Sequence, residues 1–188
     1  MGRRAPGGGI AARPPMKNLR NYILGPHTRD GLSAALLVAM FDQALKLWLL
    51  YGFDIAARSP VRVLPFFDLV LTWNKGISYG LFQQDGPWGP WILLAFKVGA
   101  VLLLWAWLAQ ASGRLTALAL GLIIGGAAGN AIDRAVYGAV VDYAYLHLHA
   151  AGLNFGWYVF NLADVAIVVG VAILLYEVLW GERAAKQP

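Results

Sequence analysis

The amino-acid sequence predicts an α-helical integral membrane protein with four transmembrane helices and a small β-sheet on the outer membrane face. Composition is the first observation: of the 188 residues 59% are hydrophobic and only 13% are charged, and the mean hydropathy is +0.58. A soluble domain of this size could not cover its surface with so few charges. The second observation is a set of four apolar stretches, each close to the roughly 20 residues that a spanning helix needs.

The N-terminal segment, residues 1–30, differs in composition from the rest of the chain. It is rich in Gly, Pro and Arg and holds six basic residues against Asp30, so it accounts for the whole net charge of +5. Because such a segment buries too little apolar surface to offset its ordering entropy, we expect a disordered basic tail. The excess charge is confined to this tail, and the sequence has no aromatic stacking platform and no nucleic-acid-binding motif. We therefore expect no nucleic-acid partner.

The four predicted spans occupy residues 32–53, 90–110, 115–136 and 162–180. Aromatic residues near their ends are typical of the membrane interface. The basic residues are concentrated in the tail, in the turn at Arg114 and after the last span, which predicts that both termini are cytoplasmic. We therefore expect one four-span domain over residues 31–181, followed by a short cytoplasmic tail at 182–188.

Two segments remain for the outer face. Residues 54–89 are rich in β-branched and aromatic residues with partial alternation, which predicts a small β-element and a loop. Residues 137–161 form a second outer loop, with an alternating stretch followed by a Gly-rich turn.

Ionisable residues inside the predicted spans are the first candidates for function, because each is costly in a bilayer unless it is paired or hydrated. Asp42 and Lys46 lie four residues apart in the first span and so share one helix face. They are either a structural ion pair or the lining of a functional cavity. Lys97, near the outer end of the second span, is interpreted as a residue that extends its amine to the interface.

A second polar group gathers at the outer ends of the last two spans: Asn130, Asp133, Arg134, Asp142, Asn161 and Asp164. Two carboxylates close together share a proton and titrate as one unit. The ionised acid can then take a proton from water while the protonated acid donates to a carbonyl oxygen, which suits amide hydrolysis without a metal. The residues alone leave open whether Asp133 or Asp142 is the partner of Asp164.

Other chemistries have weaker support. Ser78 is the best candidate for a nucleophile, but a turn serine is the simpler interpretation. His147 and His149 could form a metal site with Asp142. The sequence shows neither a further ligand at a suitable spacing nor a pattern of residues that would orient the ligands. The chain has no cysteine, which excludes disulfides and thiolate chemistry. We expect no metal and no cofactor.

Five short motifs occur in one order along the chain: DQALK at 42–46, NKGISYG at 74–80, GGAAGNAIDR at 125–134, VVDY at 140–143 and FNLAD at 160–164. In this order, and at these membrane depths, they resemble lipoprotein signal peptidase, also called signal peptidase II. The resemblance covers residues 32–180. Departures from the family pattern occur at Ile77, Ser78, Tyr79 and Val165, and none of them replaces a carboxylate.

The resemblance implies an aspartic endopeptidase of the bacterial inner membrane, with its active site toward the periplasmic leaflet. It implies cleavage of prolipoproteins on the amino side of a diacylglyceryl-modified cysteine, with membrane lipids as further partners and a monomeric enzyme. Asp142 and Asp164 would be the catalytic pair. Supporting and substrate-binding roles would fall to Asp42, Lys46, Asn74, Gly76, Asn130, Asp133, Arg134 and Asn161, and residues 54–89 would form the family's β-cradle.

Two other functional classes use the same polar residues. One is a non-enzymatic carrier or ion-coupled transporter, against which four spans without inverted-repeat halves argue. The other is a structural membrane protein, which leaves the clustered acids unexplained.

Overall fold

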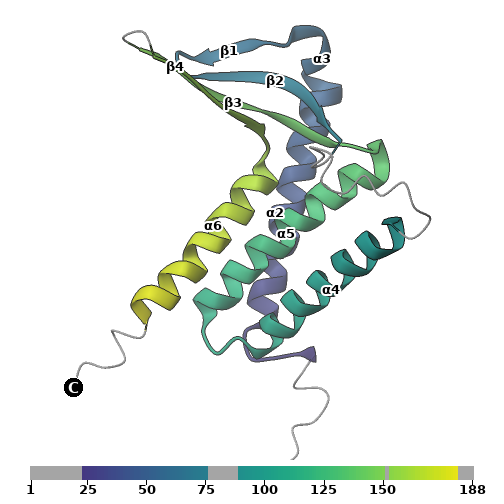
Figure 1. The fold of residues 1–188 in the computed structure, drawn as a ribbon, viewed down its shortest axis with the longest axis vertical. Helices are drawn as coiled ribbons and strands as arrows, with labels where there is room; N and C mark the ends of the chain where they lie inside the picture. Colours follow the sequence, from purple (N-terminus) through teal and green to yellow (C-terminus); the bar gives the residue numbers. More distant parts are fainter. Residues whose placement is uncertain (1–22, 76–88, 151–152, 182–188) are drawn as a thin grey trace, which may run out of the picture.

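A computed structural model describes residues 23–75, 89–150 and 153–181 of the chain. Most of the predicted basic tail, the predicted tail at 182–188, Gly76 and the family departures at 77–79 lie outside these residues. The described elements run in the order α2 (Thr28–Leu47), η1 (Trp48–Gly52), α3 (Ile55–Arg58), β1 (Val61–Leu64), β2 (Phe67–Asn74), α4 (Gly89–Gln110), α5 (Arg114–Tyr137), β3 (Val140–Ala150), β4 (Leu153–Phe160), α6 (Leu162–Tyr176) and η2 (Glu177–Gly181). Figure 1 shows the strands as a sheet at one end of the helices.

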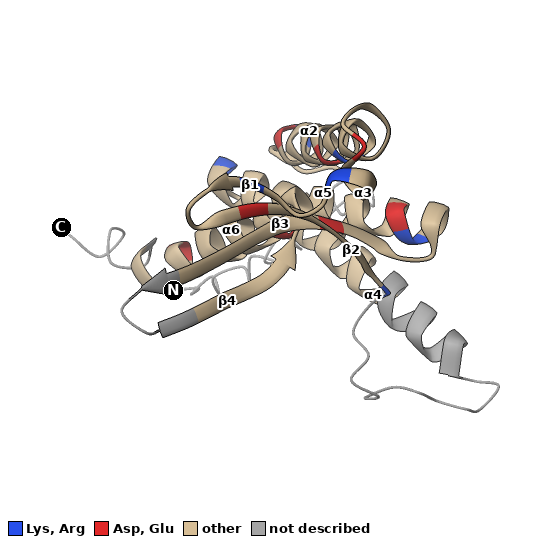
Figure 2. Cartoon of the chain, turned by 90° about the horizontal axis from the view of Figure 1, so that it is seen from above, with Lys and Arg blue, Asp and Glu red and all other residues tan. Residues whose placement is uncertain are grey.

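Three helical segments are long and apolar enough to cross a membrane: Thr28–Gly52, Arg114–Tyr137 and Leu162–Trp180. Figure 2 shows how few charged residues interrupt the described chain. α4 covers the second predicted span, and its fully described part is a shorter apolar helix, Gly99–Gln110. The prediction of a membrane protein with a small sheet is confirmed with three candidate spans, and the fourth span stays a prediction.

α5 is the central helix, because it packs closely against both α2 and α6. Glycines make this approach possible. A Cβ added to Gly125 would meet the backbone of Ala35 on α2, and one added to Gly126 would meet the backbone oxygen of Ala163 on α6. The close contact brings the polar C-terminal end of α5 between the two neighbouring helices.

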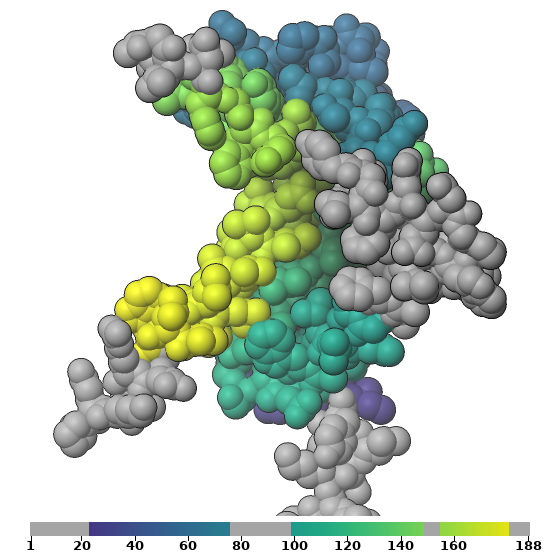
Figure 3. All heavy atoms as spheres, viewed as in Figure 1, coloured from purple at the N-terminus to yellow at the C-terminus, as the bar shows by residue number. Residues whose placement is uncertain are grey.

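The sheet is antiparallel with the order β1-β2-β3-β4, so the two predicted outer segments form one structure. β2 pairs with β3 in a register that includes Thr72↔Asp142, and β3 and β4 form a hairpin. The segment predicted as a second outer loop is therefore mostly strand. A buried cluster of Leu49, Ile55, Tyr143 and Ala144 joins β3 of the sheet to η1 and α3. Figure 3 shows the sheet overhanging α6, with a hollow between them.

Candidate active site

A buried ion cluster, formed by Asp42, Lys46 and Asp133, joins α2 to α5. The Lys46 amine lies 2.7 Å from Asp42 Oδ2 and 2.7 Å from Asp133 Oδ2, and all three side chains are almost fully buried. The predicted contact between Asp42 and Lys46 is therefore present. Asp133 is its third member, which the helix spacing did not reveal.

Gln43 completes the environment of Asp133, and sequence reasoning missed it. Its side-chain amide donates to Asp133 Oδ1 at 2.8 Å and to the Gly129 carbonyl at 3.1 Å. The backbone amide of Val141 donates to Asp133 Oδ2 at 3.0 Å. Both oxygens of Asp133 are thus occupied by contacts that hold α2, α5 and β3 together. Its position beside Asp42 in the DQALK motif was the only available signal for Gln43.

Two asparagines link Asp142 on β3 to Asp164 on α6. Asn161 Nδ2 donates to Asp142 Oδ1 at 2.7 Å and to Asn130 Oδ1 at 3.0 Å. Asn130 Nδ2 donates in turn to Asp164 Oδ1 at 2.8 Å. Asn161 and Asn130 therefore form one hydrogen-bonded chain between the two carboxylates.

Asp142 is buried at the edge where β2 and β3 meet the helices. Asn74 Nδ2, at the end of β2, donates to its Oδ2 at 2.9 Å. Burial raises the pKa of Asp142, hydrogen bonds from Asn74 and Asn161 lower it, and the negative charge of Asp164 raises it; the net direction is upward. Asp142 is therefore a carboxyl group that holds its proton to higher pH than an ordinary aspartate.

Asp164 is held by the first turn of α6. Asn161 is the N-cap, its side chain accepting from the Asp164 amide at 3.0 Å while the Asp164 carboxylate accepts from the Asn161 amide at 3.1 Å. This reciprocal capping box restricts the position of the carboxylate. The neighbouring backbone amide, that of Ala163, donates to a side chain of another helix: Asp42 Oδ1 on α2 accepts this hydrogen bond at 3.0 Å.

The arrangement places two carboxylates in a shared network of neutral amide donors, beside a buried cation. Comparison with known proteins gives the family. The family profile described as "Signal peptidase (SPase) II" matches residues 34–180. The chain belongs to the signal peptidase II family. The family name identifies a protease, so the resemblance drawn from the motifs is confirmed at the level of the family.

Relatives agree with the profile. The lipoprotein signal peptidase of Nitrobacter hamburgensis is 60% identical over 160 residues, which are 85% of this chain and 98% of the relative. The lipoprotein signal peptidase of Rhodopseudomonas palustris strain ATCC BAA-98 / CGA009 is 58% identical over 160 residues, which are again 85% of this chain and 98% of the relative. Two solved structures of a bacterial membrane enzyme superpose with TM-scores of 0.62 and 0.60, covering 84% of this chain and 91% and 97% of theirs. At 22% identity they show the fold.

Of the remaining predicted residues of this family member, Arg134 is exposed and its guanidinium donates to the Asn130 carbonyl at 3.3 Å. Gly76 and Ser78 lie outside the described residues, as does the side chain of Lys97. Among the described residues, no group of three or more His, Asp or Glu side chains is arranged to hold a metal ion. His147 lies instead against Asp68 of β2, at 3.1 Å.

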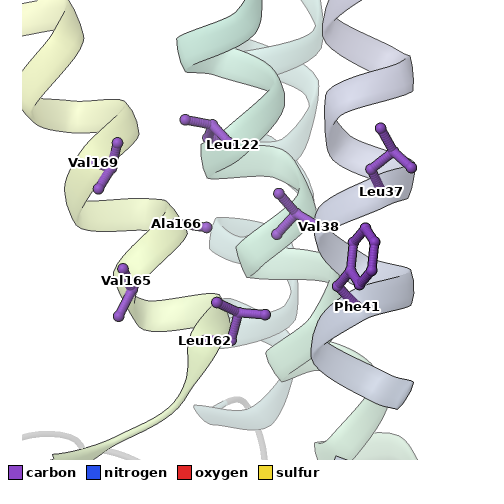
Figure 4. A pocket seen from close by; sticks show the side chains of 8 residues that line it. All are labelled: Leu37, Val38, Phe41, Leu122, Leu162, Val165, Ala166 and Val169. Carbon is purple, nitrogen blue, oxygen red and sulfur yellow. The ribbon is translucent and has the colours of Figure 1, made fainter. Parts of the chain in front are cut away.

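A separate cavity of about 330 Å³ lies among α2, α5 and α6. Figure 4 shows that its lining is apolar, with Phe41, Leu122 and Val165 among the side chains. Without a polar side chain it can hold only apolar groups, so it is not the site of the chemistry.

Proposed function

We propose that the chain is an aspartic endopeptidase of the bacterial inner membrane that removes signal peptides from diacylglyceryl-modified prolipoproteins. Cleavage falls on the amino side of the lipidated cysteine. The observation that carries this proposal is the hydrogen-bonded chain in which Asn130 and Asn161 connect Asp142 to Asp164. Family membership supplies the reaction class, and the two acids supply a means of activating water.

The dyad, Asp142 and Asp164, holds one proton between its members in the resting enzyme. Asp142 carries this proton, because burial raises the pKa of its carboxyl group. Asp164 is the ionised member, whose oxygens accept from the Asn130 side chain and the Asn161 backbone. Ionised Asp164 takes a proton from water, the resulting hydroxide attacks the scissile carbonyl carbon, and Asp142 protonates the carbonyl oxygen.

Collapse of the tetrahedral intermediate restores the enzyme. Asp164 gives its new proton to the leaving amine nitrogen, while Asp142 takes back the proton of the former carbonyl oxygen as the C–N bond breaks. One water is consumed, and an acid and an amine are released. Neither carboxylate forms a bond to the substrate, so no acyl-enzyme accumulates.

The neighbouring residues support this chemistry without reacting. The single Lys46 charge offsets one of the two acids Asp42 and Asp133, and so reduces the repulsion that this cluster adds to the dyad. Asn74 orients Asp142, and exposed Arg134 is available to bind substrate, with Gly76 in the same role by motif. With both termini cytoplasmic, the site faces the outer leaflet. The substrate is held in that leaflet by its own lipid anchor, and the enzyme acts as a monomer.

The experiment compares Asp142→Asn and Asp164→Asn with the unaltered enzyme on a synthetic diacylated prolipoprotein. Each change removes a proton-transfer group but keeps its shape, so kcat falls by at least ~100-fold. Asp54→Asn is the matched control, because Asp54 is an exposed N-cap residue of α3 on the same side of the membrane.

Cleavage at the unaltered rate by either dyad variant would contradict the dyad. A transporter would show no cleavage by the unaltered protein. Loss of activity in EDTA with recovery in zinc would favour the histidine metal site instead.

A further inference from the structure

Tyr143 directly follows Asp142 on β3, and its side chain crosses from the sheet to the start of α6. The ring is buried in the apolar cluster with Leu49 and Ile55, and only 6% of the residue is exposed. Its hydroxyl oxygen accepts a hydrogen bond from the backbone amide of Leu162 at 3.0 Å. A phenylalanine would fill the same apolar space, so packing alone does not account for the hydroxyl.

The Leu162 contact completes an unusual set of caps. The first amides of a helix have no partner within the helix. In α6 the amide of Leu162 donates to Tyr143, that of Ala163 donates to Asp42, and that of Asp164 donates to Asn161. Two of these three acceptors come from other elements, β3 and α2. The first turn of α6 is therefore fixed in space by side chains outside the helix.

We infer that Tyr143 is a positioning residue that sets the spacing of the dyad. Its hydroxyl ties the helix that carries Asp164 to the strand residue next to Asp142, by a route independent of the asparagine chain. The inference rests on the proposed function, because it concerns the same two carboxylates. Proton sharing in such a pair depends on their separation, so a fixed α6 start also fixes the pH range over which one proton is held.

The Tyr143 hydroxyl acts as a hydrogen-bond partner and does not transfer protons. Burial raises the pKa of this phenol, and the negative charges of Asp42, Asp164 and Asp142 raise it further, against a lowering by the Leu162 hydrogen bond. The group stays protonated and neutral at any pH at which the dyad holds a single proton. A neutral oxygen can accept from Leu162 without adding a charge to the site.

Tyr143→Phe tests the inference, because it removes one oxygen and keeps the ring. Without its acceptor the Leu162 amide is unsatisfied, the first turn of α6 loosens, and Asp164 moves relative to Asp142. We expect kcat to fall about tenfold with KM changed by less than about twofold. Weaker coupling between Asp142 and Asp164 also narrows the bell-shaped dependence of kcat on pH. The acidic limb moves to higher pH and the basic limb moves to lower pH.

Tyr145→Phe is the matched control, since it makes the same change two residues along β3. The Tyr145 hydroxyl lies over Gly156 of β4, away from α6, so the kinetics and the pH profile should be unaltered. A purely structural role for Tyr143 predicts a different result: the amount of folded enzyme falls, and the remaining enzyme keeps its profile width. An unaltered profile width in Tyr143→Phe, measured on folded protein, would overturn the inference.

Leu162→Pro provides a second variant that removes the donor and leaves the phenol in place. Proline suits the first position of a helix, and Asn161 already has the extended backbone (φ −132°, ψ 179°) that a following proline requires. The variant leaves no unsatisfied amide, yet it breaks the tie to β3, so the pH profile should narrow as in Tyr143→Phe. A full-width profile in Leu162→Pro would show that the tie does not set the dyad spacing. Absence of cleavage by the unaltered enzyme would refute the proposed function, a separate outcome.

Discussion

The ion cluster and the dyad lie next to each other and are built from the same kind of acid, but their partners differ. In the ion cluster, Asp42 and Asp133 each lie 2.7 Å from the amine of Lys46. Asp142 instead receives hydrogen bonds from the neutral amides of Asn74 and Asn161. The Lys46 amine binds both acids of the ion cluster directly and ties them in place, whereas Asp142 has only neutral donors at hydrogen-bond distance, and burial raises its pKa. The difference separates a structural acid from one that can exchange protons.

The largest expected effect comes from removing the cation, with Lys46→Met. Two buried carboxylates would then face each other without a counter-charge, and breaking a buried ion pair from one side typically costs ~3–5 kcal/mol. Thermal unfolding in detergent should show this loss. Lys75→Met is the control, because Lys75 is exposed and its removal should change stability by less than ~0.5 kcal/mol. Equal unfolding temperatures for the two variants would refute the structural role of the ion cluster.

The sequence motifs predicted much of the difference between the ion cluster and the dyad. Spacing along one helix was enough to pair Asp42 with Lys46, and family likeness chose Asp142 over Asp133 as the proposed partner of Asp164. The structure supplies a physical reason for that choice, since Asp133 is occupied by Lys46, Gln43 and the Val141 amide.

Contacts between distant segments could not be predicted in the same way. Lys46 and Asp133 lie far apart in the sequence and meet only because small residues bring α5 close to α2. The pairing of β2 with β3 joins two segments that lie far apart in the sequence, and the second outer segment was predicted as a loop. Tyr143 was visible in the VVDY motif, but its acceptor role depends on where α6 begins relative to β3.

An intermediate effect is expected from Asn74→Ala, which alters the dyad alone. The hydrogen bond from Asn74 favours the ionised form of Asp142 and so lowers its pKa. Without that bond the pKa of Asp142 rises, and the group keeps its proton to higher pH. The basic limb of the kcat profile should therefore move to higher pH by about one unit.

Thr72→Ala is the control for Asn74→Ala, because Thr72 is opposite Asp142 in the sheet register and its side chain is exposed. Its pH profile should match that of the unaltered enzyme. Movement of the basic limb to lower pH in Asn74→Ala would show that Asp142 is not the member of the dyad that holds the proton.

The smallest effect is expected from Gln43→Ala, which acts on the ion cluster alone. Asp133 would lose one neutral donor but keep Lys46 and the Val141 amide, so the cost should be about 1 kcal/mol in unfolding free energy. Because Gln43 does not contact Asp142 or Asp164 through any hydrogen bond among the described residues, the width of the kcat profile should be unaltered. A narrowed or shifted profile in Gln43→Ala would mean that the two groups of acids titrate together, and the separation between structural and proton-exchanging carboxylates would fail.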